Sequence, residues 1–239
     1  MLQLDLTLPT PAQNLACDEA LLELCDCGQA DEILRFWEPA QYFVVVGYAN
    51  HVATEVNIEF CRQQNISVLR RCTGGGTVLQ GPGCLNYSLL LRIEGPHPVA
   101  SITAANNFVM SRLRDALAKL LRAPVEHVGH TDLAIGGLKF SGNAQRRCKR
   151  FLLFHGCFLL HLDIELVEKT LQLPSRQPDY RVRRSHADFL MNVKVPSSVI
   201  KMELAKAWNA TEALSRVPTA DIEVLAQTKY SSPEWNLKL

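Results

Sequence analysis

Several features are absent from this sequence, and each absence narrows what the protein can do. No apolar run reaches the roughly 18 residues that a membrane span needs, so we expect no membrane partner. The formal net charge is only +1 and the pI is near 7.6. There is therefore no broad electrostatic field for nucleic acid, and we expect no nucleic-acid partner. The chain also lacks internal repeats and low-complexity segments.

Cysteine is plentiful but lacks the paired spacing of a metal site. The eight cysteines are scattered, without a C-x-x-C pair or a recognisable signal peptide. We therefore expect reduced thiols in a cytoplasmic protein. Cys25 and Cys27 stand too close together for a zinc-ribbon knuckle. The other cysteines are Cys17, Cys61, Cys72, Cys84, Cys148 and Cys157.

The residues that are present support a large core in one main domain. The chain has 239 residues, of which 47% are hydrophobic. Strand-like apolar patterns predict strands at residues 2–8, 33–37, 42–46, 66–70, 86–91, 133–135, 138–140 and 151–162. Helical patterns predict one helix capped by Asn14 and others at residues 54–65, 101–121, 163–173, 197–209 and 220–230.

Two pairs of these strands are predicted to form hairpins. Residues 33–37 and 42–46 are joined by a short segment around Pro39, and residues 133–135 and 138–140 by a Gly-Gly pair that supplies the positive φ angles of a two-residue turn. Residues 175–184 are polar and basic, which is typical of a loop. Because strands pair through hairpins without a regular βαβ order, we predict an α+β (mixed α/β) fold with a largely antiparallel central sheet flanked by helices.

Residues 70–88 hold five of the 13 glycines and are the most informative stretch. Two arginines precede Gly74, Gly75 and Gly76, which present backbone N–H groups without an obstructing Cβ atom, so a ligand carrying phosphate can lie directly on the chain. A flexible linker between two strands is the alternative. The pattern is neither a P-loop nor the G-x-G-x-x-G of a dinucleotide fold.

The flanks of the glycine triplet carry a family resemblance. The pattern Arg-Arg-x-x-Gly-Gly-Gly-x-Val, followed by Gly-x-Leu-Asn-x-Ser, resembles the first signature of the lipoate-protein ligase family. The resemblance implies the biotin and lipoate ligase fold, related to class II aminoacyl-tRNA synthetase cores, and a loop that binds substrate and adenylate. The residues to which it assigns this binding are Arg70, Arg71, Gly74, Gly75, Gly76, Thr77, Val78, Gln80, Gly83, Leu85 and Asn86.

A second segment, Lys-Phe-Ser-Gly-Asn-Ala-Gln from residue 139, resembles the family's second signature. A lysine beside a carboxylate and an α-phosphate neutralises charge as their oxygens meet, although a lone lysine on a hairpin is most often solvated. The resemblance makes Lys139 the catalytic residue. It assigns substrate or adenylate binding to Ser141, Gly142, Ala144 and His155, and the histidine also suits a core position.

Three positions need separate comment because they only partly match the family. Asp132 is kept from a Gly-Arg-Asn-Asp-like segment and is expected to help hold Mg²⁺. His130 and Thr131 depart from that segment. Gln80 replaces a histidine, and because an amide does not titrate near neutral pH, proton transfer at this position is not expected. The basic segment 180–186 suits nucleotide phosphates, an acidic acceptor domain or plain solvent.

The resemblance implies a lipoate-protein ligase catalytic domain over residues 1–239, without the accessory domain that follows in larger ligases. Such an enzyme uses ATP and Mg²⁺ to convert lipoate or octanoate into acyl-AMP, and then acylates a lysine of a lipoyl-domain acceptor. A separate accessory-domain chain is a candidate partner.

Two alternatives stay open at this point. One is an ATP-independent octanoyl or lipoyl transferase of the same fold, acting through a cysteine thioester. The other is a non-catalytic subunit that binds lipoyl-AMP. Cys72 and Cys84 flank the glycine loop, but residues 124–131 and 173–180, where related transferases carry their cysteine, have none. ATP dependence is therefore the expectation.

Overall fold

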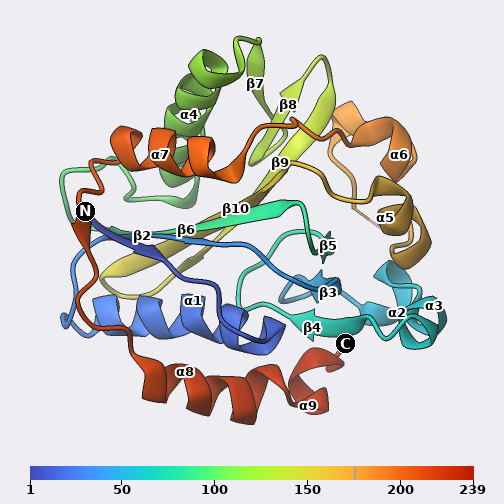
Figure 1. The fold of residues 1–239 in the computed structure, drawn as a ribbon, viewed down its shortest axis with the longest axis horizontal. Helices are drawn as coiled ribbons and strands as arrows, with labels where there is room; N and C mark the ends of the chain where they lie inside the picture. The colour runs from blue at the N-terminus through green and yellow to red at the C-terminus, as the bar shows by residue number, and fades with distance from the viewer. Residues whose placement is uncertain (175) are drawn as a thin grey trace.

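The fold is built on a large, mainly antiparallel sheet, seen in a computed structural model that describes residues 1–174 and 176–239 (Figure 1). Its eight strands run in the order β11-β1-β2-β6-β10-β9-β8-β7, and a smaller sheet has the order β4-β3-β5. Among the described strands of the large sheet, β1 is parallel to both β2 and β11, and the other pairs are antiparallel. The predicted α+β class with a largely antiparallel sheet is confirmed. The strands are β1 (Leu2–Asp5), β2 (Ile33–Trp37), β3 (Phe43–Val46), β4 (Ser67–Arg70), β5 (Val78–Gln80), β6 (Cys84–Arg92), β7 (Val125–Val128), β8 (Asp132–Ile135), β9 (Leu138–Arg147), β10 (Phe151–Leu159) and β11 (Glu212–Ala213).

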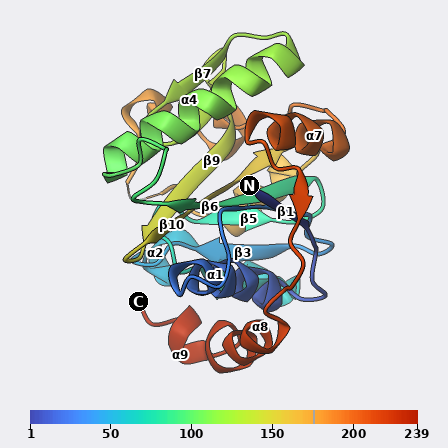
Figure 2. The ribbon, with the colours of Figure 1, turned by 90° about the vertical axis from the view of Figure 1, so that its left-hand side faces the viewer.

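Helices cover both faces of the large sheet. One layer holds α4 (Ile102–Leu121) and α7 (Ser197–Ala207), and the opposite layer holds α1 (Pro11–Asp26) and α8 (Thr219–Leu225), as Figures 1 and 2 show. A π-helical turn (Ala226–Tyr230) continues α8. The remaining helices are short: α2 (Val52–Glu55), α3 (Ile58–Gln63), α5 (Ile164–Thr170), α6 (His186–Phe189), α9 (Pro233–Asn236) and the 3₁₀ turn Asp179–Arg181. No helix in the described ranges is long and apolar enough to cross a bilayer.

The central strands are buried on both faces, and this follows from the two-residue period of a strand. On β10, Leu152 and Phe154 belong to the core under α4, whereas Phe151 and Leu153 belong to the core over α1. Polar residues on these strands are consequently shut away from water and need partners inside the protein. His155, whose side chain is 12% exposed, is largely covered in this way.

One predicted hairpin is confirmed and the other is wrong. β8 and β9 are joined by Gly136 and Gly137, both at positive φ, and β9 runs on to Arg147. In contrast, β2 lies between β1 and β6 in the large sheet, whereas β3 lies between β4 and β5 in the small one. Both strands are fully buried, so each needs two neighbours, and the five residues that connect them carry the chain from one sheet to the other.

Two predicted helix boundaries are also wrong. The cap of α1 is Thr10, whose side chain accepts a hydrogen bond from the backbone N–H of Gln13 and whose own N–H donates back to Gln13, in a capping box. Asn14 lies inside the helix. The helix expected at residues 54–65 is split into α2 and α3, because Asn57 caps a second helix by accepting from the N–H of Phe60. Of the loop predicted at residues 175–184, residue 175 lies outside the described residues.

The small sheet sets the position of the functional site. It packs over the end of β6 and β10 on the α1 side, through a core cluster that joins Val44 and Leu79 of the small sheet to Leu159 of the large one. Helix α1 covers one part of this face of the large sheet, and the small sheet covers the next part. The two sheets enclose a space between them.

Candidate functional site

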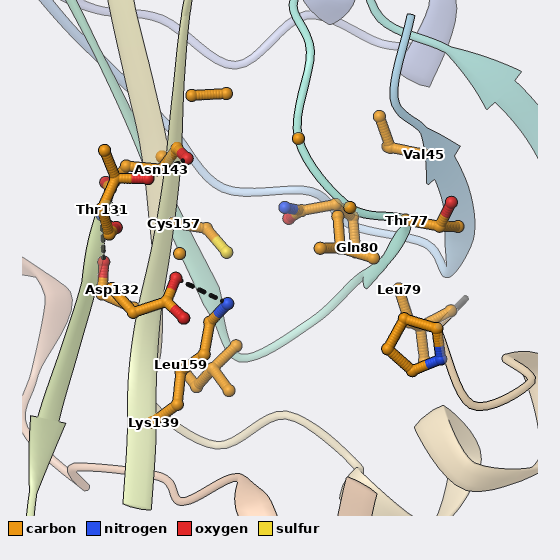
Figure 3. Close-up of a pocket in the computed structure, with 18 of the residues that line it drawn as sticks. Val45, Thr77, Leu79, Gln80, Thr131, Asp132, Lys139, Asn143, Cys157 and Leu159 are labelled. Atoms are coloured by element: carbon orange, nitrogen blue, oxygen red, sulfur yellow. Dashed lines mark hydrogen bonds and ion pairs between the residues drawn. The ribbon is translucent and has the colours of Figure 1, made fainter. Parts of the chain in front are cut away.

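A cavity of ≈ 530 Å³ lies between the two sheets (Figure 3). Part of its wall is apolar and includes Trp37, Val45 and Leu159. The rest is polar, with Lys139 and Asp132 on the hairpin side and Arg71 under the glycine loop. Such a mixture of apolar walls and a few convergent polar groups is typical of a small-molecule site.

Arg71 fixes the glycine loop from below. Its guanidinium donates hydrogen bonds to the carbonyl oxygens of Gly74 and Gly76, with Nη2–O distances of 2.6 and 2.8 Å. Burial lowers the pKa of Arg71 to about 10, so it still carries its charge at neutral pH. Gly75 has φ +87°, and a Cβ atom there would lie 2.9 Å from Arg71 Nη2. The triplet is therefore a shaped part of the site and not a slack linker.

A buried chain of hydrogen bonds supports Arg71. Asp18 on α1 accepts from His155 Nδ1 at 2.9 Å, and the Oγ1 atom of Thr73 lies 2.7 Å from His155 Nε2. Thr73 Oγ1 also accepts from Arg71 Nε at 3.0 Å. Arg35 completes the Asp18 pair at 2.5 Å. The chain connects helix α1 to the glycine loop along one face of the sheet.

Asp18 keeps its charge in spite of its burial. Burial alone raises the pKa of this carboxyl, but Arg35 and His155 lower it further than burial raises it, so its pKa lies below the ordinary value. The ionised carboxylate is the form that accepts from both partners.

Lys139 is held at the cavity by an acidic partner. Its Nζ atom lies 2.8 Å from Asp132 Oδ1, and the lysine side chain is 23% exposed. The other carboxylate oxygen of Asp132 accepts from the hydroxyl of Tyr180 at 2.7 Å. Burial and Asp132 raise the pKa of Tyr180, which keeps it a proton donor. Gly142 makes room for the lysine, because a Cβ atom at Gly142 would lie 2.7 Å from Nζ.

Cys157 presents a thiol to the same space. It pairs with Gly142 across β10 and β9, so it lies next to the position of the Lys139 amine, and Figure 3 shows its sulfur on that side. The Cys84 thiol and the Gln80 amide lie beside the Cys157 sulfur and favour its thiolate form. These groups, with the positive charges of Lys139 and Arg71, lower the pKa of Cys157 although burial opposes them.

Gln80 is oriented for this contact. Its Oε1 atom accepts from Asn86 Nδ2 at 3.0 Å, which leaves its NH₂ group to donate, and in Figure 3 the amide faces the Cys157 sulfur. Gln80, which stands where the family has a histidine, is therefore the residue whose amide faces Cys157.

Most of the predicted site residues come together here. Those that line the cavity are Arg71, Gly75, Gly76, Thr77, Val78, Gln80, Asn86, Asp132, Lys139, Ser141, Gly142, Ala144 and His155.

Four other predicted residues lie outside the cavity. Arg70 is fully buried and donates to the carbonyl oxygens of Gly47, Tyr48 and Asn50, so it braces the chain behind the site. Gly83 lies against the backbone of residue 161. Leu85 is in the core under α4, and Gly74 lies at the outer edge of the loop.

Sequence reasoning missed Cys157, Asp18, Thr73 and Tyr180. One signal for Cys157 was available: it stands two residues after His155 on the same strand, so the two side chains share a face. No local pattern marks Asp18, because nothing in the nearby sequence shows that α1 packs against His155.

The donor set does not fit a dedicated magnesium site. Both oxygens of Asp132 already have partners, and the described part of the chain has no group of three or more His, Cys, Asp or Glu side chains that suits a metal ion. A magnesium ion entering with a nucleotide would depend on the phosphate oxygens and water for most of its ligands.

The chain resembles characterised proteins over nearly its whole length. Residues 10–207 match the family model of the lipoyl protein ligase A/B catalytic domain. Octanoyltransferase LipM of Bacillus subtilis is 29% identical, with 96% of this chain and 95% of the relative covered.

Two solved structures share the fold. A bi-partite lipoate protein ligase from Thermoplasma acidophilum, studied with its E2 lipoyl domain, superposes with a TM-score of 0.82 at 24% identity, covering 99% of this chain and 96% of that one. Lipoate-protein ligase A bound with ATP gives a TM-score of 0.81 at 25% identity, with 99% of each chain covered.

Proposed function

Because the chain belongs to the lipoyl protein ligase A/B catalytic domain family, we propose that it is an acyl transferase: it moves an octanoyl or lipoyl group, without ATP, onto Cys157 and then onto a lysine of a lipoyl domain. The Cys157 thiol in the cavity carries this proposal. The expected ATP dependence rested on the lack of a cysteine at two segments, and a cysteine in the cavity supports a thioester route instead. The likeness to an octanoyltransferase points the same way.

The first half-reaction begins with the Cys157 thiolate, which attacks the carbonyl carbon of a donor thioester. The carbon–sulfur bond of the donor breaks, and the departing sulfur takes a proton from the Lys139 ammonium. The acyl group is now a thioester on Cys157. The lowered pKa of Cys157 and the proximity of Lys139 are what this step requires.

The second half-reaction restores the enzyme. The amine of the acceptor lysine attacks the Cys157 thioester, the cysteine sulfur leaves as thiolate, and a proton of the attacking amine passes to Lys139. Asp132 holds the Lys139 amine in place throughout, at 2.8 Å. An amide has formed, and both enzyme residues have regained their starting protonation states.

The apolar wall of the cavity suits a medium-length acyl chain. Each buried methylene contributes about 0.8 kcal/mol, so an octanoyl tail gains about 5 kcal/mol in such a space. Trp37, Val45 and Leu159 offer the surface for it. The binding of the chain orders it beside the thiol, which is the geometric requirement for attack.

An ATP-dependent ligase is the second candidate, favoured by the glycine loop. Arg71 holds the carbonyl oxygens of Gly74 and Gly76 on its own side, so the loop can turn N–H groups toward an α-phosphate. A related protein of this fold is known with ATP bound. In the ligase reaction, Lys139 neutralises the charge of the reacting oxygens and Cys157 takes no part. The likeness to a bi-partite ligase makes a separate accessory chain a proposed partner.

The two candidates are separated by the donor that each needs. The purified chain is mixed with a lipoyl domain and either octanoylated acyl carrier protein without ATP, or octanoate with MgATP. We expect acylation of the lipoyl domain from the thioester donor, lost in Cys157→Ser and kept in Cys27→Ser, whose cysteine is exposed. Acylation only with octanoate and MgATP, with pyrophosphate release and no loss in Cys157→Ser, would establish the ligase and overturn the transferase.

A further inference from the structure

Cys157 has a second cysteine, Cys84, beside it, and the proposed transfer reaction does not use Cys84. Cys84 opens β6 and Cys157 lies on β10, 73 residues later in the chain. In the register of these antiparallel strands Cys84 is opposite Leu159 and Cys157 is opposite Asn86, so the cysteines are diagonal neighbours on one face of the sheet. Both side chains belong to the buried cluster that joins the small sheet to β6 and β10, and each thiol shifts the pKa of the other.

The two thiols differ in their surroundings. Cys157 is 6% exposed and lines the cavity, through which a small oxidant can reach its sulfur, whereas Cys84 is 1% exposed and does not line the cavity. The neighbouring thiol lowers the pKa of Cys157, whereas the same interaction together with burial raises that of Cys84. One thiol is therefore suited to react first, and the other to react with the product.

We propose that Cys84 and Cys157 form a reversible disulfide when hydrogen peroxide enters the cavity, and that this disulfide switches the site off. The loss of activity in this proposal rests on the transferase role of Cys157, whereas the bond formation does not.

The chemistry of the switch balances. The Cys157 thiolate attacks one peroxide oxygen, the O–O bond breaks, and the departing hydroxide takes a proton to become water, leaving a sulfenic acid on Cys157. The Cys84 sulfur then attacks the Cys157 sulfur, the S–O bond breaks, and the hydroxyl group leaves as a second water with the Cys84 proton. Two thiols have been oxidised and one peroxide reduced. The closed disulfide has a sulfur–sulfur distance of about 2.05 Å.

Cys84 also limits the damage that an oxidant does. A cysteine sulfenic acid without a neighbouring thiol proceeds to sulfinic and sulfonic acids, which ordinary reductants do not reverse. With Cys84 in contact, the reaction stops at a bond that a thiol reductant cleaves. Cys84 therefore makes the oxidation of Cys157 reversible instead of permanent.

The bond is tested by mass spectrometry of the intact chain treated with a small excess of hydrogen peroxide. We expect a loss of two hydrogen masses, and, after trypsin, a crosslink between the peptides covering residues 72–92 and 151–169. Because the first peptide also contains Cys72, its fragment ions must place the bond at Cys84. A crosslink at Cys72, or addition of oxygen to Cys157 without a crosslink, contradicts the proposal.

Activity is followed in the same samples, with two variants. Wild-type acyl transfer should fall at least tenfold on oxidation and return with a thiol reductant. Cys84→Ala should show oxygen addition to Cys157 and a loss that the reductant does not restore, while the control Cys148→Ser, which leaves the pair intact, behaves as wild type. If the crosslink forms but transfer persists, the disulfide stands and the role of Cys157 as nucleophile fails. If transfer depends on Cys157 and no crosslink forms, the switch fails alone.

Discussion

The Nζ atom of Lys139 lies 2.8 Å from Oδ1 of Asp132, and this ion pair holds the lysine above Gly142 and beside Cys157. A hairpin lysine is usually free in solvent, whereas this one is largely covered and committed to a partner. The same contact shows why Asp132 is a poor choice for a metal ligand, since Tyr180 takes its other oxygen. In either candidate function, the ion pair keeps the positive charge of Lys139 next to the reacting carbonyl group.

Replacing Lys139 with Ala should leave the fold intact and reduce acyl transfer by about 10²- to 10⁴-fold, the usual contribution of a positioned acid or base. The lysine tip adds little to the core, so thermal unfolding should be nearly unchanged. The measurement is the rate of acylation of a lipoyl domain, with the exposed Lys119→Ala as the matched control. A Lys139→Ala protein that turns over at the wild-type rate removes this residue from the active centre.

Gly75→Val should abolish acyl-donor binding without unfolding the chain. The residue has φ +87°, where a β-branched side chain is strained, and its Cβ would meet the Arg71 guanidinium that shapes the loop. Gly74→Ala is the matched control, because a Cβ atom there meets nothing within 4 Å. Binding is measured by calorimetry with octanoyl-coenzyme A, in a Cys157→Ser background that prevents transfer. Tight binding to a folded Gly75→Val protein would reduce the triplet to a linker.

Gln80→Leu should raise the pKa of Cys157. Its amide is one of the two hydrogen-bond donors that favour the thiolate, and leucine offers none. The rate of alkylation of Cys157 by iodoacetamide, followed on its tryptic peptide, should therefore rise with pH along a curve displaced to higher pH than in the wild type. Gln63→Leu, on exposed α3, is the control. An unchanged curve would mean that Gln80 does not contact the thiolate.

Asp18→Asn should destabilise the protein and weaken its acid sensitivity. The native pKa of Asp18 lies below its unfolded value, so its stabilising contribution is present above pH of about 4 and is lost as the pH falls through the native pKa. Removing the carboxylate leaves Arg35 buried and unpaired, at a cost of about 3–5 kcal/mol at pH 7.

Urea unfolding at pH 7 and at pH 3 measures both effects of Asp18→Asn. The exposed Asp115→Asn should change the free energy of unfolding by less than about 1 kcal/mol. If Asp18→Asn is as mild as Asp115→Asn, the buried chain through His155 is not structural.

The sequence alone predicts those parts of the site that depend on residues close together in the chain. The Gly-Gly turn before β9 requires positive φ at both positions, and the glycine loop requires a residue such as Gly75 that tolerates φ +87°. The alternation along β10 places Phe154 and His155 on opposite faces, as a two-residue period predicts.

The rest depended on contacts between distant segments. β2 and β3 read as a hairpin because they are close in sequence, but each is buried on both faces and finds its neighbours elsewhere. Cys157 reads as a core thiol until the small sheet is placed over β10, which opens a cavity at its sulfur. Asp18 meets His155 across 137 positions of sequence, and no local pattern carries that information.

The most direct test of the central claim is the intact mass of the protein after brief mixing with octanoyl-coenzyme A in the absence of ATP and acceptor. The account predicts one octanoyl group per chain, located on Cys157, absent in Cys157→Ser, and discharged when a lipoyl domain is added. An unmodified chain that acylates the lipoyl domain only when octanoate and MgATP are supplied would contradict it.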